Sequence, residues 1–225
     1  MSGTTRHVPI VQHILSANDE IAQQNRLILD EAGTYAINIM ASPGAGKTSV
    51  ILATFERVKE VLRLGMINGD IATSIDADKA SDAGMPSVAI NTGGNCHLEA
   101  NMLRGALAQI DLKTIDLLLV ENVGNLVCPA GWDLGTHLNV LVASVPEGDD
   151  KPYKYPSMYR NVQALIINKV DLAPYIDFKM DYFIQGVEVL NPGLVTFPMS
   201  ARTGEGVDDW VSWLKEQVKA HQHGG

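Results

Sequence analysis

A loop between a strand and a helix constrains this chain more than any other feature. Residues 37–41 are apolar except for Asn38 and partly β-branched, and residues 50–61 are rich in helix formers. The loop that joins them reads Ser42, Pro43, Gly44, Ala45, Gly46, Lys47, Thr48, Ser49. Its glycines let backbone N–H groups approach an anion, and the helix N-terminus adds unpaired donors. We therefore expect Lys47 to reach the β- and γ-phosphates of a nucleotide and the Thr48 hydroxyl to hold Mg²⁺.

The loop departs from the Walker A pattern at its first position, where Ala41 replaces the usual glycine. Alanine is tolerated there if its φ is negative, because only a left-handed φ demands glycine. The second half of the pattern, Gly46 to Thr48, is intact. The alternative is an ordinary strand-to-helix turn with a surface lysine.

Strands and helices alternate along the rest of the chain, which predicts an α/β fold of the P-loop NTPase type: a doubly wound, mostly parallel sheet with helices on both faces. We expect one domain overall, with residues 35–225 forming the nucleotide-binding domain and residues 1–34 a helical extension. The other predicted strands are 65–68, 87–90, 115–120, 137–145, 164–167 and 194–198. The other predicted helices are 8–32, 74–82, 98–110, 173–190 and 207–220, with a loop over 146–159.

The first predicted helix carries apolar residues near helical spacing, and Gly33 follows as a C-cap. These apolar residues are Val11, Ile14, Leu15, Ile21, Leu27 and Ile28. We expect one helix that packs on the flank of the sheet. It could be broken near residue 18, and the alternative role is to dock a partner.

Composition limits the function and the location of the protein. The net charge is −9 and the pI is near 5.0, which disfavours nucleic-acid binding. No apolar run approaches the roughly 20 residues that span a bilayer, and residues 1–9 lack a signal peptide's apolar segment. We therefore expect a cytoplasmic protein without a membrane partner. In such a reducing compartment its two cysteines indicate free thiols or metal ligands rather than a disulfide.

Two strands end in carboxylates at the expected phosphate site. Glu121 ends the buried strand 115–120, and Gly124 follows with an N–H that can meet a γ-phosphate. Asp70 ends the strand 65–68 in a similar way. With Lys47 they form the predicted catalytic set, and Thr48, Asp70 and Glu121 the predicted Mg²⁺ ligands. The alternative is that each carboxylate only caps a turn.

A second strand end indicates a preference for guanine. Asn168-Lys169-x-Asp171 follows an apolar strand, and the Asp171 carboxylate can accept two hydrogen bonds from guanine N1–H and N2–H₂. Adenine offers no such donor pair. After the last strand, Ser200, Ala201 and Arg202 can present backbone N–H groups to the guanine oxygen.

These motifs resemble GTPases of the signal-recognition, MinD and BioD class, and within it the HypB family of hydrogenase nickel-incorporation GTPases. The discriminating segments are Asn91-Thr92-Gly93-Gly94-Asn95-Cys96-His97-Leu98 and Glu121-Asn122-Val123-Gly124-Asn125-Leu126-Val127-Cys128-Pro129. The resemblance implies a GTP-hydrolysing metallochaperone that helps insert nickel during NiFe-hydrogenase maturation. It also implies a GTP-dependent homodimer, with hydrogenase maturation proteins and the hydrogenase large subunit as partners.

Cys96, His97 and Cys128 are the predicted ligands of Ni²⁺ or Zn²⁺. A helix following Cys96 would lower its pKa. Three ligands do not complete a tetrahedral site, so either a dimer pools ligands or water fills an open position. The resemblance implies the dimer. The alternative is that both cysteines are small buried hydrophobic residues and that His97 caps the helix.

Glu121 and Cys128 are only seven residues apart, at most about 25 Å of extended chain. We therefore hypothesise that GTP binding and hydrolysis reshape the metal site and so load or release nickel. No glutamine or arginine is firmly placed to orient water, which predicts low turnover. His221 and His223 are too few for a nickel store and indicate a frayed tail. The alternatives are a zinc-stabilised, GTP-dependent assembly switch, or a chaperone GTPase for urease or a cobalamin enzyme.

Overall fold

The computed structural model describes the backbone of residues 10–223 and the side chains of residues 15–223. Its strands form one sheet of seven, all parallel, in the order β3-β2-β4-β1-β5-β6-β7. The strands are β1 (Tyr35–Ala41), β2 (Leu64–Asp70), β3 (Ser87–Asn91), β4 (Leu117–Glu121), β5 (Leu138–Ser144), β6 (Ala164–Asn168) and β7 (Val195–Pro198). The predicted parallel α/β architecture is confirmed.

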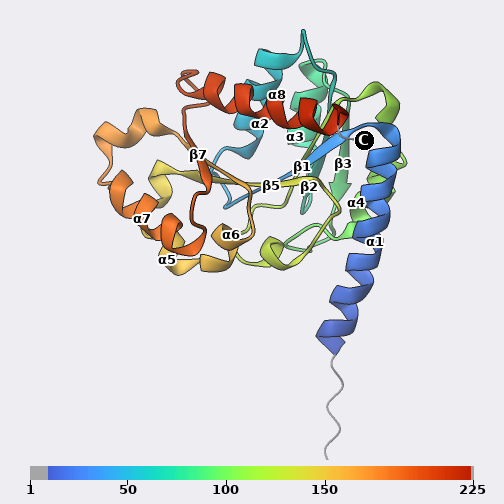
Figure 1. The fold of residues 1–225 in the computed structure, drawn as a ribbon, viewed down its shortest axis with the longest axis horizontal. Helices are drawn as coiled ribbons and strands as arrows, with labels where there is room; N and C mark the ends of the chain where they lie inside the picture. Colours follow the sequence, from blue (N-terminus) through green and yellow to red (C-terminus); the bar gives the residue numbers. More distant parts are fainter. Residues whose placement is uncertain (1–9, 224–225) are drawn as a thin grey trace, which may run out of the picture.

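Helices cover both faces of this sheet, as Figure 1 shows. They are α1 (Ile10–Ala32), α2 (Lys47–Val58), α3 (Ile75–Asp82), α4 (Ala100–Leu107), α5 (Lys151–Lys154), α6 (Pro156–Arg160), α7 (Met180–Leu190) and α8 (Val207–His223). Four 3₁₀ segments join them: η1 (Leu112–Thr114), η2 (Cys128–Gly131), η3 (Val145–Glu147) and η4 (Val170–Tyr175). Among these described helices, none combines the length and the apolar character needed to cross a bilayer.

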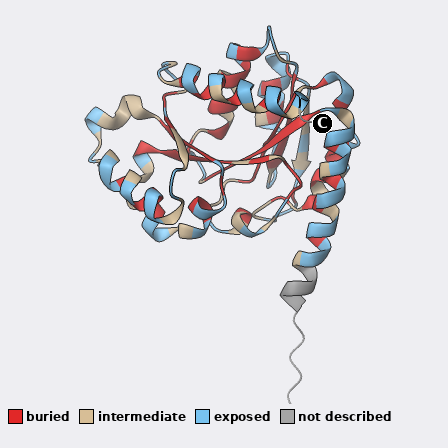
Figure 2. Ribbon diagram, viewed as in Figure 1, coloured by how far each residue is buried: buried red, intermediate tan, exposed pale blue. Residues whose placement is uncertain are grey.

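The apolar core lies on both sides of the sheet because successive strand residues point to opposite faces. On β1, Ile37 and Ile39 join the cluster under α2 and α8, while Ala36 and Met40 point the other way. The second face carries two separate apolar clusters, one under α1 and α4 and one under α6 and α7. Figure 2 shows the buried strands between helices whose outer surfaces are exposed.

Asparagine side chains occupy the gap between those two clusters. Asn38 Nδ2 donates to Asn139 Oδ1 at 3.0 Å, and Asn122 Nδ2 donates to Asn38 Oδ1 at 3.2 Å. Asn38 and Asn122 are each no more than 1% exposed. Buried amides of this kind are stable only when paired, so they fix how β1, β4 and β5 lie against each other.

Helix α1 is continuous from Ile10, so the alternative of a break near residue 18 is wrong. The predicted start of this helix, at residue 8, lies outside the described residues. The buried stripe also differs from the predicted apolar one: Asn18, Ala22, Asn25 and Leu29 are buried, whereas Leu27 is 60% exposed. Close packing explains which residues of α1 are buried, since a Cβ at Gly135 would clash with the carbonyl oxygen of Ala22. The small residue Ala22 therefore faces the loop before β5, and the buried amides of Asn18 and Asn25 lie on either side of it.

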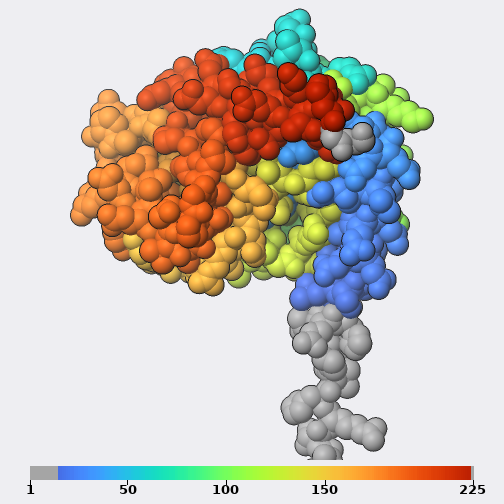
Figure 3. Space-filling model, in the orientation of Figure 1, coloured from blue at the N-terminus to red at the C-terminus, as the bar shows by residue number. Residues whose placement is uncertain are grey.

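Three other segments differ from the prediction. Residues 146–159 contain η3, α5 and most of α6 rather than only a loop, because prolines at the first turns of all three suit a helix start. The predicted helix 173–190 begins at Met180, after a 3₁₀ segment with an internal proline. The C-terminal tail is not frayed at His221, whose ring lies 5.3 Å from Tyr35 and 4.4 Å from His137. In Figure 3 the end of α8, in red, lies beside the end of α1, in blue.

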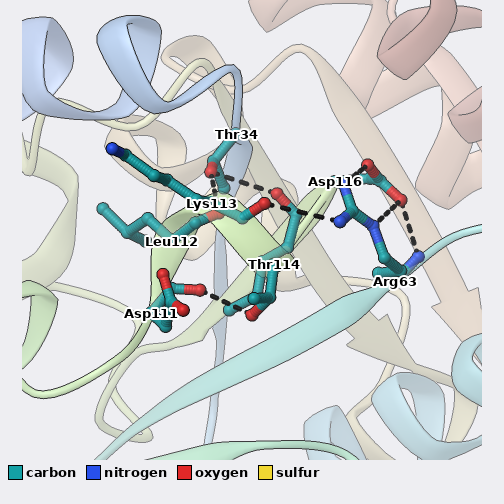
Figure 4. Close-up of polar contacts among 8 residues, drawn as sticks. Thr34, Arg63, Asp111, Leu112, Lys113, Thr114 and Asp116 are labelled. Carbon is teal, nitrogen blue, oxygen red and sulfur yellow. Dashed lines mark hydrogen bonds and ion pairs between the residues drawn. The ribbon is translucent and has the colours of Figure 1, made fainter.

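Polar contacts fasten the amino ends of the central strands, opposite the predicted site (Figure 4). Arg63 and Asp116 precede β2 and β4, and their side chains pair at 2.6 Å while the Arg63 N–H also donates to Asp116. Thr34, before β1, donates to the carbonyl oxygens of Leu112 and Ile115. The Arg63 guanidinium holds the pKa of Asp116 below its usual value. These contacts set the start of three adjacent strands, and therefore where the strands end.

Candidate nucleotide and metal site

The phosphate loop connects β1 to α2 at the carboxyl edge of the sheet. Gly44 and Gly46 have φ of +78° and +99°, which favour glycine. A Cβ at Gly46 would also lie 2.5 Å from Asn168 Nδ2. Ala41 is the last, fully buried residue of β1, and among the described non-glycine residues only Lys169 has a positive φ. The substitution of glycine by Ala41 therefore introduces no backbone strain.

A cavity of about 400 Å³ opens beside this loop. Its lining includes the three predicted catalytic residues together with Pro43, Gly44, Asn68, Gly69, Ile71, Asp76, Asn122, Val123 and Gly124. Thr48 Oγ1 donates to Glu121 Oε1 at 3.0 Å at the cavity edge. Burial raises the pKa of Glu121 and lowers the pKa of Lys47. The oxygen donors of Thr48, Asp70 and Glu121 are the type that Mg²⁺ prefers, so this set fits the ion.

Asp70 lines the cavity and forms a turn at the same time. Its Oδ1 accepts hydrogen bonds from the N–H groups of Ala72 and Thr73 at 2.9 and 2.8 Å. These bonds lower the pKa of Asp70, so its carboxyl stays ionised. One carboxylate oxygen of Asp70 therefore forms the turn that the alternative interpretation expected, and the carboxyl group also lines the phosphate cavity.

Sequence reasoning missed Glu147. This residue, in η3 after β5, accepts a hydrogen bond from Ser144 Oγ at 2.8 Å and another from Ser42 Oγ of the phosphate loop. Ser42 is thus held from the side of β5 rather than left free. The only signal was that Glu147 follows closely after a strand end, in a segment interpreted as a loop.

The residues predicted to read the base lie together in a second cavity of about 250 Å³. It is lined by Ser49, Asn168, Lys169, Asp171, Leu172, Ser200, Ala201 and Arg202. Asn168 braces the loops by donating to Ala45 O at 2.9 Å and accepting from Ala201 N at 3.1 Å. Asp171 Oδ1 is buried without a hydrogen-bond partner among the described residues. A buried acceptor without a partner fits a ligand that brings N–H donors.

Cys96, His97 and Cys128 converge, and their ligand atoms lie within 4.8 Å of one another. Adjacent residues face one point because the backbone at Cys96 and His97 is a bend outside any helix or strand. The imidazole of His97 lies 4.5 Å from the Trp132 ring, and its buried Nε2 makes no hydrogen bond in the described structure, with Glu99 Oε1 3.9 Å away. Two sulfurs and an imidazole nitrogen without a hydrogen bond form a donor set that suits Ni²⁺ or Zn²⁺.

The expected lowering of the Cys96 pKa by a helix N-terminus is wrong. Helix α4 begins at Ala100, four residues after Cys96, which is beyond the reach of the first turn's dipole. A hydrogen bond with Cys128, and then burial, raise the pKa of the Cys96 thiol.

Asparagine residues connect the phosphate cavity and the phosphate loop to the cysteine segments. Asn122 Oδ1 accepts the N–H of Leu98 at 3.0 Å, one residue beyond His97. Asn125 Oδ1 accepts the N–H groups of Val127 and Cys128 at 2.8 and 3.3 Å. The Asn125 N–H in turn donates to Ala41 O at 2.8 Å, at the start of the phosphate loop. Movement of this loop would therefore reach both cysteines.

Asp30, His137 and His221 form another group of potential ligand atoms. His137 Nδ1 accepts the N–H of Ala36 at 2.9 Å, so the neutral ring carries its proton on Nε2, which lies 2.8 Å from Asp30 Oδ1. No lone pair remains on Nε2 for a metal, and this cluster is a hydrogen-bonded support for β1.

Comparisons with known proteins show which family and which structures the chain is similar to. Residues 35–197 match the family model "CobW/HypB/UreG, nucleotide-binding domain". The chain is 42% identical over 213 residues to hydrogenase maturation factor HypB of Azotobacter vinelandii, covering 95% of this chain and 70% of that protein. It is also similar to the crystal structure of HypB from Helicobacter pylori in complex with nickel: TM-score 0.87, 35% identity, 92% of this chain and 97% of that one. HypB from Archaeoglobus fulgidus gives a TM-score of 0.85 at 37% identity, over 91% and 100% of the two chains.

Proposed function

This chain belongs to the HypB group of the CobW/HypB/UreG family of P-loop NTPases, and we propose that it is a GTP-hydrolysing metallochaperone that delivers nickel during NiFe-hydrogenase maturation. Relatives named hydrogenase maturation factor HypB support the pathway, and a nickel complex of one relative supports the metal.

GTP is the proposed nucleotide because Asp171 offers a buried, unpartnered carboxylate oxygen in the second cavity. Lys47 would neutralise the charge that develops on the γ-phosphate. Thr48, with Asp70 or Glu121, would hold Mg²⁺, which supplies Lewis-acid stabilisation of the phosphate oxygens. No glutamine or arginine is among the described residues lining the phosphate cavity, which supports slow hydrolysis.

Nickel is the proposed cargo of Cys96, His97 and Cys128, and Zn²⁺ is a second ion that this donor set accepts. Three protein ligands leave a tetrahedral metal incomplete, so we propose that a GTP-dependent homodimer pools ligands from both copies. Hydrogenase maturation proteins and the hydrogenase large subunit are the proposed partners.

One observation carries this proposal: the segment that leaves β4 carries a nucleotide-site residue and a metal-site residue. Glu121 accepts a hydrogen bond from Thr48, and seven residues later Cys128 lies within 4.8 Å of the other metal-site donors. A nucleotide that moves this segment would change the position of a metal ligand.

Replacement of each cysteine tests the function. Cys96→Ser and Cys128→Ser would be introduced into a host that depends on this protein for nickel-dependent hydrogenase activity. We expect activity to be lost while the GTP-bound dimer, measured by sedimentation, persists. Full activity in both variants would contradict nickel delivery. Loss of the dimer would instead favour the zinc-stabilised assembly switch.

A further inference from the structure

Helix α1 holds both cysteine-bearing segments through two asparagines on its buried face. Asn18 and Asn25 are seven residues apart, about two helical turns, so their side chains project from the same side. They are 6% and 0% exposed. Asparagine has a modest helix propensity and is expensive to bury unpaired, so its presence twice in a buried stripe requires specific partners.

Asn25 connects the two segments directly. Its Nδ2 donates to Ala100 O at 2.8 Å and to Leu134 O at 3.1 Å, and its Oδ1 accepts from Arg104 Nε at 3.3 Å. Ala100 follows His97 by three residues, and Leu134 follows Trp132, the ring neighbour of His97, by two. One buried amide therefore joins the backbone behind His97 to the backbone behind Trp132.

Asn18 makes a second bridge between the same segments. Its Oδ1 accepts the N–H of Ala100 at 2.9 Å, and its Nδ2 donates to Asp133 O at 2.8 Å. Ala100 is the first residue of α4, and its N-cap, Glu99, provides no side-chain cap. Asn18 therefore caps α4 from another helix.

Two of these bonds, both to Ala100, act on a short segment with little regular structure of its own. Between β3 and α4 the chain has only turns and bends, and Cys96 and His97 lie in the bend that leads to α4. The segment is fixed on one side by Asn122, which holds Leu98, and on the other by Asn18 and Asn25, which hold Ala100. The amides on α1 are not part of the phosphate or base cavity.

We propose that Asn18 and Asn25 are positioning residues for the metal site, which set the distance between the Cys96–His97 pair and the Cys128 segment. This inference rests on the proposed metal function of those three side chains. It assigns α1 a role in metal affinity rather than in nucleotide binding.

The test compares Asn25→Ala and Asn18→Ala with Asn191→Ala in the full-length protein. Asn191 is a matched control, because its Nδ2 also donates to two carbonyl oxygens, those of Tyr159 and Val162, and neither residue belongs to a cysteine-bearing segment. Ni²⁺ affinity, the thiolate-to-nickel charge-transfer absorption and GTP affinity would be measured for each variant. The thermal midpoint of each variant reports its general loss of stability.

We expect Ni²⁺ affinity to fall about tenfold for Asn25→Ala and less for Asn18→Ala, with an altered absorption band and unchanged GTP affinity. Asn191→Ala should lower the thermal midpoint without changing the band. If Asn25→Ala does not fold, Asn18→Ala alone decides. Wild-type bands and affinity in the α1 variants would overturn the positioning role while leaving nickel binding intact. A wild-type protein without a cysteine-dependent nickel band would overturn both proposals.

Discussion

Glu121 and Asn122, consecutive residues at the end of β4, make contact with two different sites. Glu121 accepts a hydrogen bond from Thr48 Oγ1 at 3.0 Å, next to the phosphate loop. Asn122 Oδ1 accepts the N–H of Leu98 at 3.0 Å, beside His97. Neighbouring residues on an extended chain point in opposite directions, so one strand end serves both sites. This gives the proposed coupling between nucleotide and metal a physical route.

Replacing Asn122 should weaken that coupling. We expect Asn122→Ala to reduce the coupling free energy between nucleotide and nickel by about 0.5–2 kcal/mol, because the Leu98 N–H loses its acceptor. Titration of nickel with each bound nucleotide measures the effect. Asn139→Ala is the control, since it removes a bond from the same asparagine network without touching Leu98. An equal reduction in both variants would show that the network, not the Leu98 contact, carries the coupling.

Asp171 should determine the base. Asp171→Asn removes the carboxylate that would pair with guanine N1–H and N2–H₂. We expect this loss to weaken the binding free energy of GTP by about 3 kcal/mol, or roughly a hundredfold in affinity. Binding of labelled GTP and xanthosine triphosphate would be compared, because xanthine presents an oxygen where guanine has its amino group. Asp177→Asn makes the same substitution at an exposed position and should bind GTP normally. Undiminished GTP binding by Asp171→Asn would contradict the guanine assignment.

His137 should make the fold sensitive to acid. Burial lowers the pKa of His137 in the folded state, with Arg26 and His221 opposing its protonation and Asp30 favouring it. The unfolded chain therefore takes up a proton first, and the unfolding free energy should fall as pH drops below about 6.5. One such proton contributes up to about 1.4 kcal/mol per pH unit. Protonation of His137 would also place a proton on Nδ1. That nitrogen could then no longer accept the hydrogen bond from the Ala36 N–H.

Urea unfolding at pH 7.5, 6.5 and 5.5 measures this dependence. The unfolding free energy of His137→Asn should depend less steeply on pH than that of the parent. Part of the dependence should remain, because burial also lowers the pKa of the half-buried His97. The amide oxygen of the introduced asparagine can still accept the N–H of Ala36. His223→Asn, at an exposed position, serves as the control and should match the parent. Identical slopes in all three proteins would refute the contribution of His137.

The fold and the nucleotide loops could be predicted because their signals are local. A buried parallel strand is a short apolar run, and the phosphate and base loops are contiguous motifs at strand ends. Ala41 showed that a departure from a motif matters only where backbone geometry demands glycine. The short helices α5 and α6 were missed because their prolines, which favour turns, also favour the first turn of a helix.

The supports of the metal site could not be predicted for a different reason. Asn18 and Asn25 are polar, so a search for apolar periodicity assigns them to the exposed face of α1. Their partners are backbone groups about 75 to 115 residues away, and no side-chain pattern records such a bond. Asn122 likewise serves the backbone of Leu98. Contacts of this kind become visible only once the sheet has brought its strand ends together.

The affinity of the wild-type protein for Ni²⁺, measured by titration with bound GDP and with bound non-hydrolysable GTP analogue, tests the central claim most directly. A shared segment between Glu121 and Cys128 predicts that the two affinities differ by at least about fivefold, a coupling free energy near 1 kcal/mol. The difference should shrink in Cys128→Ser, which lacks the ligand on that segment but keeps the contact between Asn122 and Leu98. Equal nickel affinities in the two nucleotide states of the wild-type protein would contradict the account.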